Sequence, residues 1–141
     1  NQSTYERVGK GALMMPSNQS QTDISRNYVL KALRDEKKGT GYYPWFCFAA
    51  ALGEYRSKNY KAAELHCKES LSNTRETHLH HNGLNNALLS LIYLKTDQKS
   101  KAIEAIGIAK DCYNGLKDNR NNNHDTILIQ LLVKEYESAI L

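Results

Sequence analysis

Apolar residues recur along most of the chain at the three- and four-residue spacing of an α-helix. No stretch alternates apolar and polar residues for more than a few positions, and prolines occur only at Pro16 and Pro44. The pattern predicts an all-α protein of about seven helices, without a sheet. The expected helical ranges are 4–15, 23–38, 44–58, 60–72, 82–95, 98–113 and 124–141.

Residues that favour helix ends set these boundaries. Pro16 disfavours a helical residue before it, so the first helix should stop there. Asp23 is a good N-cap for the second helix, and Gly39 suits its C-terminal end. Pro44 fits the first turn of the third helix. Polar stretches at 17–22, 73–81 and 117–123 are expected to be connecting loops.

The chain contains an internal repeat. Residues 58–63 align with residues 97–102, an offset of 39 residues (97 − 58). Residues of similar size or polarity occupy equivalent positions at this offset. The aligned pairs are Ala51 with Ser90, Ala63 with Ala102, Cys67 with Ile106, and Ser70 with Ala109. Small residues at such positions allow the two helices of a pair to approach closely. A helix pair that cannot bury its apolar face alone stacks on a neighbouring pair.

The second copy of the repeat resembles a tetratricopeptide (TPR) repeat, a helix pair of about 34 residues. Its signature positions are occupied by Leu89, Ser90, Tyr93, Ala102, Ile106 and Ala109. The first copy departs from the pattern, because Glu54 stands where tyrosine is expected and Tyr55 follows it. The resemblance implies a TPR-like α-solenoid of antiparallel helices, with three helix pairs and a closing helix.

We expect a single TPR-like domain over residues 1–141. It would comprise an N-terminal helix pair at 1–39, a first TPR unit at 44–77, a second at 83–116, and a closing helix at 124–141. The closing helix is apolar around most of its circumference, whereas a terminal cap should have a polar outer face. We therefore expect it to fold back across the array or to form a dimer contact.

Four segments resemble the carboxyl-terminal TPR region of large bacterial serine/threonine protein kinases. They are residues 5–16, 45–56, 88–109 and 124–141. The resemblance implies a helical appendage of a kinase-like multidomain protein. The chain begins with Asn1 rather than Met, and we expect it to be a fragment of such a protein. It contains no glycine-rich phosphate loop, H-R-D motif or D-F-G motif, so the resemblance does not carry kinase activity.

Charge and hydropathy narrow the range of partners. The net charge is +4, and basic residues are interspersed with acidic ones. Even the densest basic stretch, at residues 34–38, is interrupted by Asp35 and Glu36. Nucleic-acid-binding proteins usually gather their basic residues on one face, so we expect no nucleic-acid partner. No apolar run approaches the roughly 18 residues of a membrane helix, so we expect no membrane partner.

The histidines and cysteines are the residues from which a metal or catalytic site could be built. Three dispersed cysteines, Cys47, Cys67 and Cys112, fit buried free thiols in a reducing cytoplasm. His66, His78, His80 and His81 lack the spacing that would bring three or four zinc ligands together. We expect no metal, no cofactor, no catalytic residues and no enzymatic activity.

Aromatic residues cluster near the start of the third predicted helix. In the repeat register, one face of the third and fifth predicted helices lines a concave groove. The predicted peptide-binding residues are Trp45, Phe48, Leu52, Tyr55, Arg56, Leu84, Leu91 and Lys95. Tyr55, Arg56 and Lys95 are expected to be exposed, and the two basic residues would recognise acidic groups. The alternative for Trp45 and Phe48 is packing in the core.

Two functional hypotheses follow. The first is a non-catalytic protein–protein interaction module that binds a partner peptide or helix in the groove. The second is a structural element that packs on other domains of the parent chain or forms a homodimer. A small-molecule enzyme ranks third, and an enclosed pocket with convergent polar groups would favour it.

Overall fold

The computed structural model describes residue 13, residues 18–118 and residues 124–141. The described residues form α-helices joined by turns and contain no strand, which confirms the all-α prediction. The helices are α2 (Gln19–Asp35), α3 (Tyr43–Arg56), α4 (Tyr60–Ser72), α5 (Leu79–Lys95), α6 (Lys99–Asp118) and α7 (His124–Ala139). Apart from Leu13, the predicted helix over 4–15 lies outside the described residues, so the total of about seven helices stays a prediction.

Two predicted helix starts are wrong, and capping side chains explain both. α2 begins at Gln19 rather than Asp23, because the Asn18 side chain accepts a 2.9 Å hydrogen bond from the backbone N–H of Gln21. α5 begins at Leu79 rather than at residue 82. Here the Nδ1 atom of His78 accepts from the backbone N–H of His81 at 3.4 Å.

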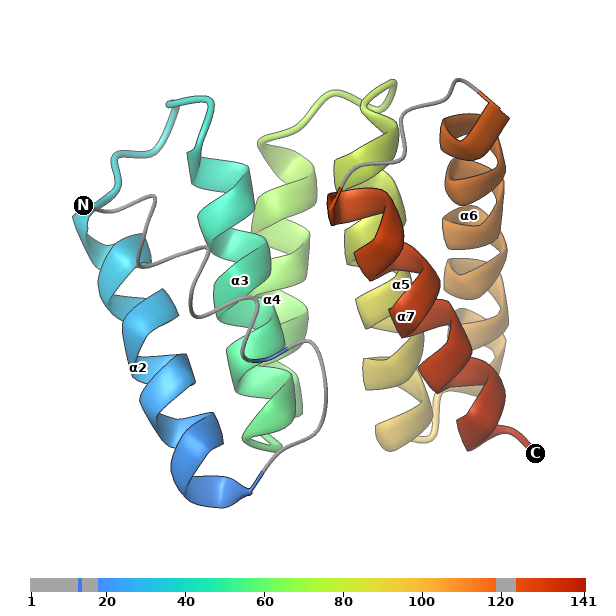
Figure 1. Ribbon diagram of the computed structural model, residues 1–141, viewed down its shortest axis with the longest axis horizontal. Helices are drawn as coiled ribbons and strands as arrows, with labels where there is room; N and C mark the ends of the chain where they lie inside the picture. The colour runs from blue at the N-terminus through green and yellow to red at the C-terminus, as the bar shows by residue number, and fades with distance from the viewer. Residues whose placement is uncertain (1–12, 14–17, 119–123) are drawn as a thin grey trace. The chain divides into compact units, whose positions relative to one another are not determined.

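The chain divides into two compact units, unit 1 (Asn1–Asn73) and unit 2 (Thr74–Leu141). Unit 1 contains α2, α3 and α4, and unit 2 contains α5, α6 and α7 (Figure 1). The helix pair of the first predicted repeat therefore lies in unit 1, and that of the second lies in unit 2.

The two helix pairs share the same turn. Lys58 and Asp97, which are equivalent in the 39-residue repeat (97 − 58), both have a left-handed backbone, with φ of 65° and 56°. In each turn the next residue donates its backbone N–H to a carbonyl five positions earlier at 2.8 Å, from Asn59 to Glu54 and from Gln98 to Tyr93. This bond closes the last helical turn and reverses the chain. The repeat inferred from the sequence is thus present in the backbone geometry.

In unit 1, α3 packs against both α2 and α4. Every residue from Phe46 to Tyr55 is buried, so α3 has no solvent-facing stripe. Gly53 allows the close approach of α2, since a Cβ atom there would lie 3.1 Å from Val29 Cγ2 and 3.3 Å from Arg26 Cα. α3 is therefore the central helix of its unit.

In unit 2, α5 packs against α6 and α7, and α7 also packs against α6 (Figure 1). Gly83 allows α6 and α7 to pack closely on α5, because a Cβ atom there would lie 2.7 Å from Ile129 Cδ1 and 3.1 Å from Cys112 Cβ. Ile129 and Leu132 of α7 are fully buried. The closing helix thus covers the second helix pair, which accounts for much of its apolar character.

An ion pair between the buried Glu54 and the partly exposed Arg26 explains why the first repeat departs from the TPR pattern at Glu54. One carboxylate oxygen of Glu54 accepts a 2.8 Å hydrogen bond from Nε of Arg26 on α2, and Nη2 of the same guanidinium lies 2.8 Å from that oxygen. The other accepts from the Asn59 side chain at 2.8 Å. The equivalent residue of the second repeat is Tyr93, whose ring lies 5.6 Å from the Lys101 ammonium. Glu54 joins α2 to the turn after α3, a role that tyrosine could not fill.

Candidate functional site

The predicted groove residues lie mostly in the interior. Phe48, Leu52 and Leu84 have no exposed surface, and Leu91 is 2% exposed. Tyr55 is also buried, at 7% exposure, so its expected exposure was wrong. Its ring packs 5.8 Å from the ring of Tyr60 at the start of α4. Because other helices pack on both sides of a central helix, the face that was predicted to line a groove lies in the core instead.

The other three predicted residues retain exposed surface. Trp45 and Arg56 are half-buried, and Lys95 is exposed. Arg56 does not project freely, because its Nε donates a 2.8 Å hydrogen bond to the backbone carbonyl of Leu13. Lys95 is in the last turn of α5 and borders a concave surface of unit 2.

That surface, called here the apolar hollow, is formed by the end of α5, the start of α6 and the end of α7. Its volume is about 570 Å³. Ile103 and Ile140 on its walls are 65% and 57% exposed. The lining residues are Leu94, Lys95, Lys99, Ile103, Tyr136, Ala139 and Ile140. Two lysines and no carboxylate are among them.

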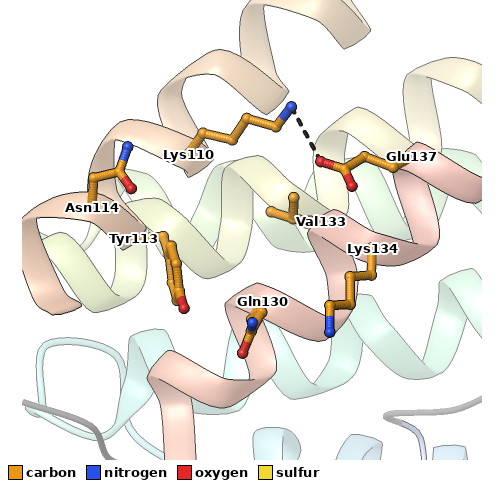
Figure 2. A pocket seen from close by; sticks show the side chains of 7 residues that line it. All are labelled: Lys110, Tyr113, Asn114, Gln130, Val133, Lys134 and Glu137. Carbon is orange, nitrogen blue, oxygen red and sulfur yellow. Dashed lines mark ion pairs between the residues drawn. The ribbon is translucent and has the colours of Figure 1, made fainter.

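A second concave surface, the polar hollow, lies between α6 and α7 and has a volume of about 360 Å³. Its lining residues are Lys110, Tyr113, Asn114, Gln130, Val133, Lys134 and Glu137. Figure 2 shows an ion pair that spans the two helices at one end, with the Lys110 ammonium 3.3 Å from a Glu137 carboxylate oxygen. The Tyr113 phenol and the Gln130 amide lie toward the other end (Figure 2).

The two hollows are neighbours along one pair of antiparallel helices. The apolar hollow uses residues 99–103 of α6 and 136–140 of α7, while the polar hollow uses 110–114 and 130–137. We call the line of these two hollows, which share no lining residue, the α6–α7 seam. Its lining contains four lysines and one glutamate, a net charge of +3 (4 − 1). The seam is therefore a positively charged surface with an apolar end.

The cysteines are not activated for nucleophilic chemistry. Burial raises the pKa of the Cys47 thiol to about 11 and also raises the pKa of Cys67 and of Cys112. Thiols with raised pKa values stay protonated at neutral pH, and the thiolate is the reactive form. Within the described part of the chain, no group of three or more His, Cys, Asp or Glu residues is arranged to hold a metal ion.

A tyrosine–carboxylate contact in unit 1 has a structural role. Tyr43 donates its hydroxyl to Glu69 at 3.0 Å, and the Lys38 ammonium lies 3.1 Å from the same carboxylate oxygen. Burial is the main reason why the pKa of Tyr43 is raised, and this hydrogen bond adds to the effect. The hydrogen bond from Lys38 is the main reason why the pKa of Glu69 is lowered. Both shifts favour a protonated Tyr43 and an ionised Glu69, the forms that make the hydrogen bond between α3 and α4.

A scan against protein-family models and searches of curated proteins and of solved structures found no match to the chain. Among the described residues, no helix combines the length and the apolar character that crossing a bilayer would need.

Sequence reasoning missed most of the α6–α7 seam. Of the eight predicted residues, only Lys95 borders it. Two sequence signals pointed there. Ile103 is a large apolar residue on the otherwise polar face of α6, and α7 is more apolar than a terminal helix needs to be. Neither signal shows which elements converge on Ile103, because that depends on how α7 packs.

Proposed function

We propose that the chain is a non-catalytic protein-interaction module that binds a peptide segment of a partner protein in the apolar hollow. The observation that carries the proposal is the pair of exposed isoleucines, Ile103 and Ile140, on the walls of a hollow bordered by Lys95 and Lys99. Large apolar side chains around a concave surface, with cations at its edge, are typical of sites that take an anchoring side chain. A volume of about 570 Å³ is within the usual range for ligand sites.

Two further observations agree with this function. The equivalent turns at Lys58 and Asp97 support a helical-repeat architecture of TPR type, a class whose members present extended binding surfaces. The protonated thiols support a module without nucleophilic catalysis. Bacterial origin and association with a kinase rest on the sequence resemblance, a cytoplasmic location rests on the dispersed free cysteines, and all three belong to the same proposal.

Self-association is the second candidate function. It is favoured by exposed isoleucines on α6 and α7 outside the hollow, Ile108 at 41% and Ile127 at 52% exposure. Sedimentation of the purified chain over a range of concentrations distinguishes the two candidates. A dimer that dissociates in the Ile127→Asp variant would favour self-association.

A displayed peptide library, selected with the full chain, tests the proposed function. We expect enriched peptides that no longer bind the Ile103→Asp variant, because the aspartate would place a carboxylate on the wall of the apolar hollow. Leu65→Asp is the matched control, since Leu65 is similarly exposed, at 61%, but lies on α4 in unit 1. Peptides that bind both variants equally, or no enrichment at all, would contradict the proposed site.

A further inference from the structure

We propose that the bound peptide is extended and lies along the α6–α7 seam. Its aliphatic anchor occupies the apolar hollow, an acidic residue beside the anchor contacts Lys95 and Lys99, and its backbone continues into the polar hollow. This inference rests on the proposed function and adds the chemical class, conformation and direction of the ligand.

The first argument is the length of the seam. The two hollows are lined on α6 by residues from Lys99 and Ile103 to Asn114. Ile103 and Asn114 are eleven positions apart (114 − 103), which corresponds to about 16.5 Å of helix at 1.5 Å per residue. An extended chain rises about 3.3 Å per residue, so about five residues span both hollows. A short linear segment is sufficient to occupy the seam.

The second argument is the chemistry of the polar hollow. Asn114 and Gln130 carry amides, and Tyr113 carries a hydroxyl. Each of these groups can both donate and accept hydrogen bonds. An extended backbone has free N–H and C=O groups that need such partners, whereas a helix satisfies most of its own. The polar hollow therefore suits an extended backbone better than a helix.

The third argument is charge. Lys99 lies one helical turn before Ile103 on α6, and Lys95 lies in the last turn of α5, so both are at the end of the seam remote from the polar hollow. The lining of the apolar hollow includes no acidic residue to offset them. A carboxylate next to the anchor meets two cations, while a basic residue there would be repelled. This places the acidic residue on the side of the anchor away from the polar hollow.

The Lys110–Glu137 ion pair does not obstruct this path. It is 3.3 Å long and crosses the seam at one end of the polar hollow, and its side chains are 48% and 51% exposed. Exposed ion pairs contribute little stability, so the two side chains rearrange at small cost. Lys110 can then contact the peptide backbone where it passes from one hollow to the other.

The test uses the full chain and twelve-residue peptides enriched from the displayed library. We expect Asp or Glu beside a Leu, Ile or Phe anchor. The double variant Lys95→Glu, Lys99→Glu should weaken the binding of these peptides about tenfold or more. A library selected with this variant should instead yield peptides with Lys or Arg beside the anchor. The control is Lys31→Glu with Lys61→Glu, two exposed lysines in unit 1.

Backbone recognition is tested separately. The double variant Asn114→Ala, Gln130→Ala should weaken binding about tenfold, since each lost hydrogen bond costs a few-fold in affinity. Gln21→Ala with Asn27→Ala on α2 is the amide-matched control. Methylation of single backbone nitrogens in the peptide should weaken binding at one or more positions on one side of the anchor. Peptides trimmed to about six residues around the anchor should keep most of their affinity.

The outcomes separate the two proposals. If enriched peptides do not depend on Ile103, the proposed function fails. If they depend on Ile103 but tolerate both backbone methylation and the amide variants, the proposed function stands and the extended path along the seam is wrong. Binding without preference for acidic residues overturns the assigned direction. A peptide that becomes helical on binding, a dimer that buries Ile103, or binding only to phosphatidylserine vesicles overturns the inference as a whole.

Discussion

At the scale of single residues, the structure depends on a carboxylate, that of Glu54, held inside unit 1. Both carboxylate oxygens of Glu54 accept hydrogen bonds, and Glu54 is only 4% exposed. A buried charge is tolerated only when it is paired and hydrogen-bonded. Removing one partner costs more than the pair itself contributes, because the remaining group loses its compensation.

Replacing Glu54 with alanine should lower the free energy of unfolding by about 2 kcal/mol, the usual cost of removing hydrogen bonds to a charged group. Arg26 is partly exposed and can reach water, which limits the loss. The matched control is Glu64→Ala, which removes an (i, i+4) ion pair with Lys68 and should cost about 0.5 kcal/mol or less. Urea denaturation measures both. Equal losses in the two variants would contradict the structural role of Glu54.

Stability should also fall in mildly acidic solution. Burial lowers the pKa of the imidazole of His66 and of His80 below the ordinary value of 6.5. The unfolded chain then binds protons more readily than the folded chain as the pH falls below 6.5, so the free energy of unfolding decreases. We expect a lower melting temperature at pH 5.5 than at pH 7.5, and a smaller difference in the His66→Gln variant.

Lys61→Gln is the control for this measurement, because Lys61 is exposed on the same helix and carries no imidazole. Its melting temperature should depend on pH as that of the parent chain does. If His66→Gln retained the whole difference between the two pH values, His66 would not be a source of the acid sensitivity.

At the scale of helices, local sequence signals predicted the bounds of some helices only. α4 has the predicted bounds, since its periodicity is regular and the Lys58 turn precedes it. The starts of α2 and α5 were missed because Asn18 and His78 act as caps within stretches that otherwise resemble loops. The burial of Phe48 and Leu84 could not be predicted, because the same helical spacing serves a groove and a core.

Glycine positions in unit 2 give a test of helix packing. Gly83→Ala should cost about 1–3 kcal/mol, because its Cβ atom would meet Ile129 and Cys112 in a closely packed interior. Gly107→Ala should instead stabilise the chain by roughly 0.5–1 kcal/mol, since the position is open and alanine favours the helix. Urea midpoints of both variants measure the difference. A neutral Gly83→Ala would show that α5, α6 and α7 pack less closely than described.

At the scale of the whole molecule, two helix pairs of one repeat are completed by different partners. α2 packs on α3 in unit 1, whereas α7 packs on both α5 and α6 in unit 2. The sequence repeat predicted the helix pairs, but it carried no information about the helices that complete them. The α6–α7 seam is a consequence of that difference, which is why it could not be placed from the repeat register.

Because every residue lining the seam lies between positions 94 and 140, unit 2 should bind peptide without unit 1. We expect a fragment of residues 74–141 to give a helical circular dichroism spectrum and to bind the selected peptides within about threefold of the full chain's affinity. Titration with a fluorescent peptide measures the two affinities. A helical fragment that does not bind would place part of the site outside unit 2.

The Glu54–Arg26 pair also bears on folding fidelity. A chain with two similar helix pairs can misassemble if the helix that should cover one pair docks on the other pair. α7 contains no arginine, so its docking on α3 in place of α2 would enclose the Glu54 carboxylate without a guanidinium. We therefore expect the pair to disfavour docking of α7 on α3 in place of α2 during folding.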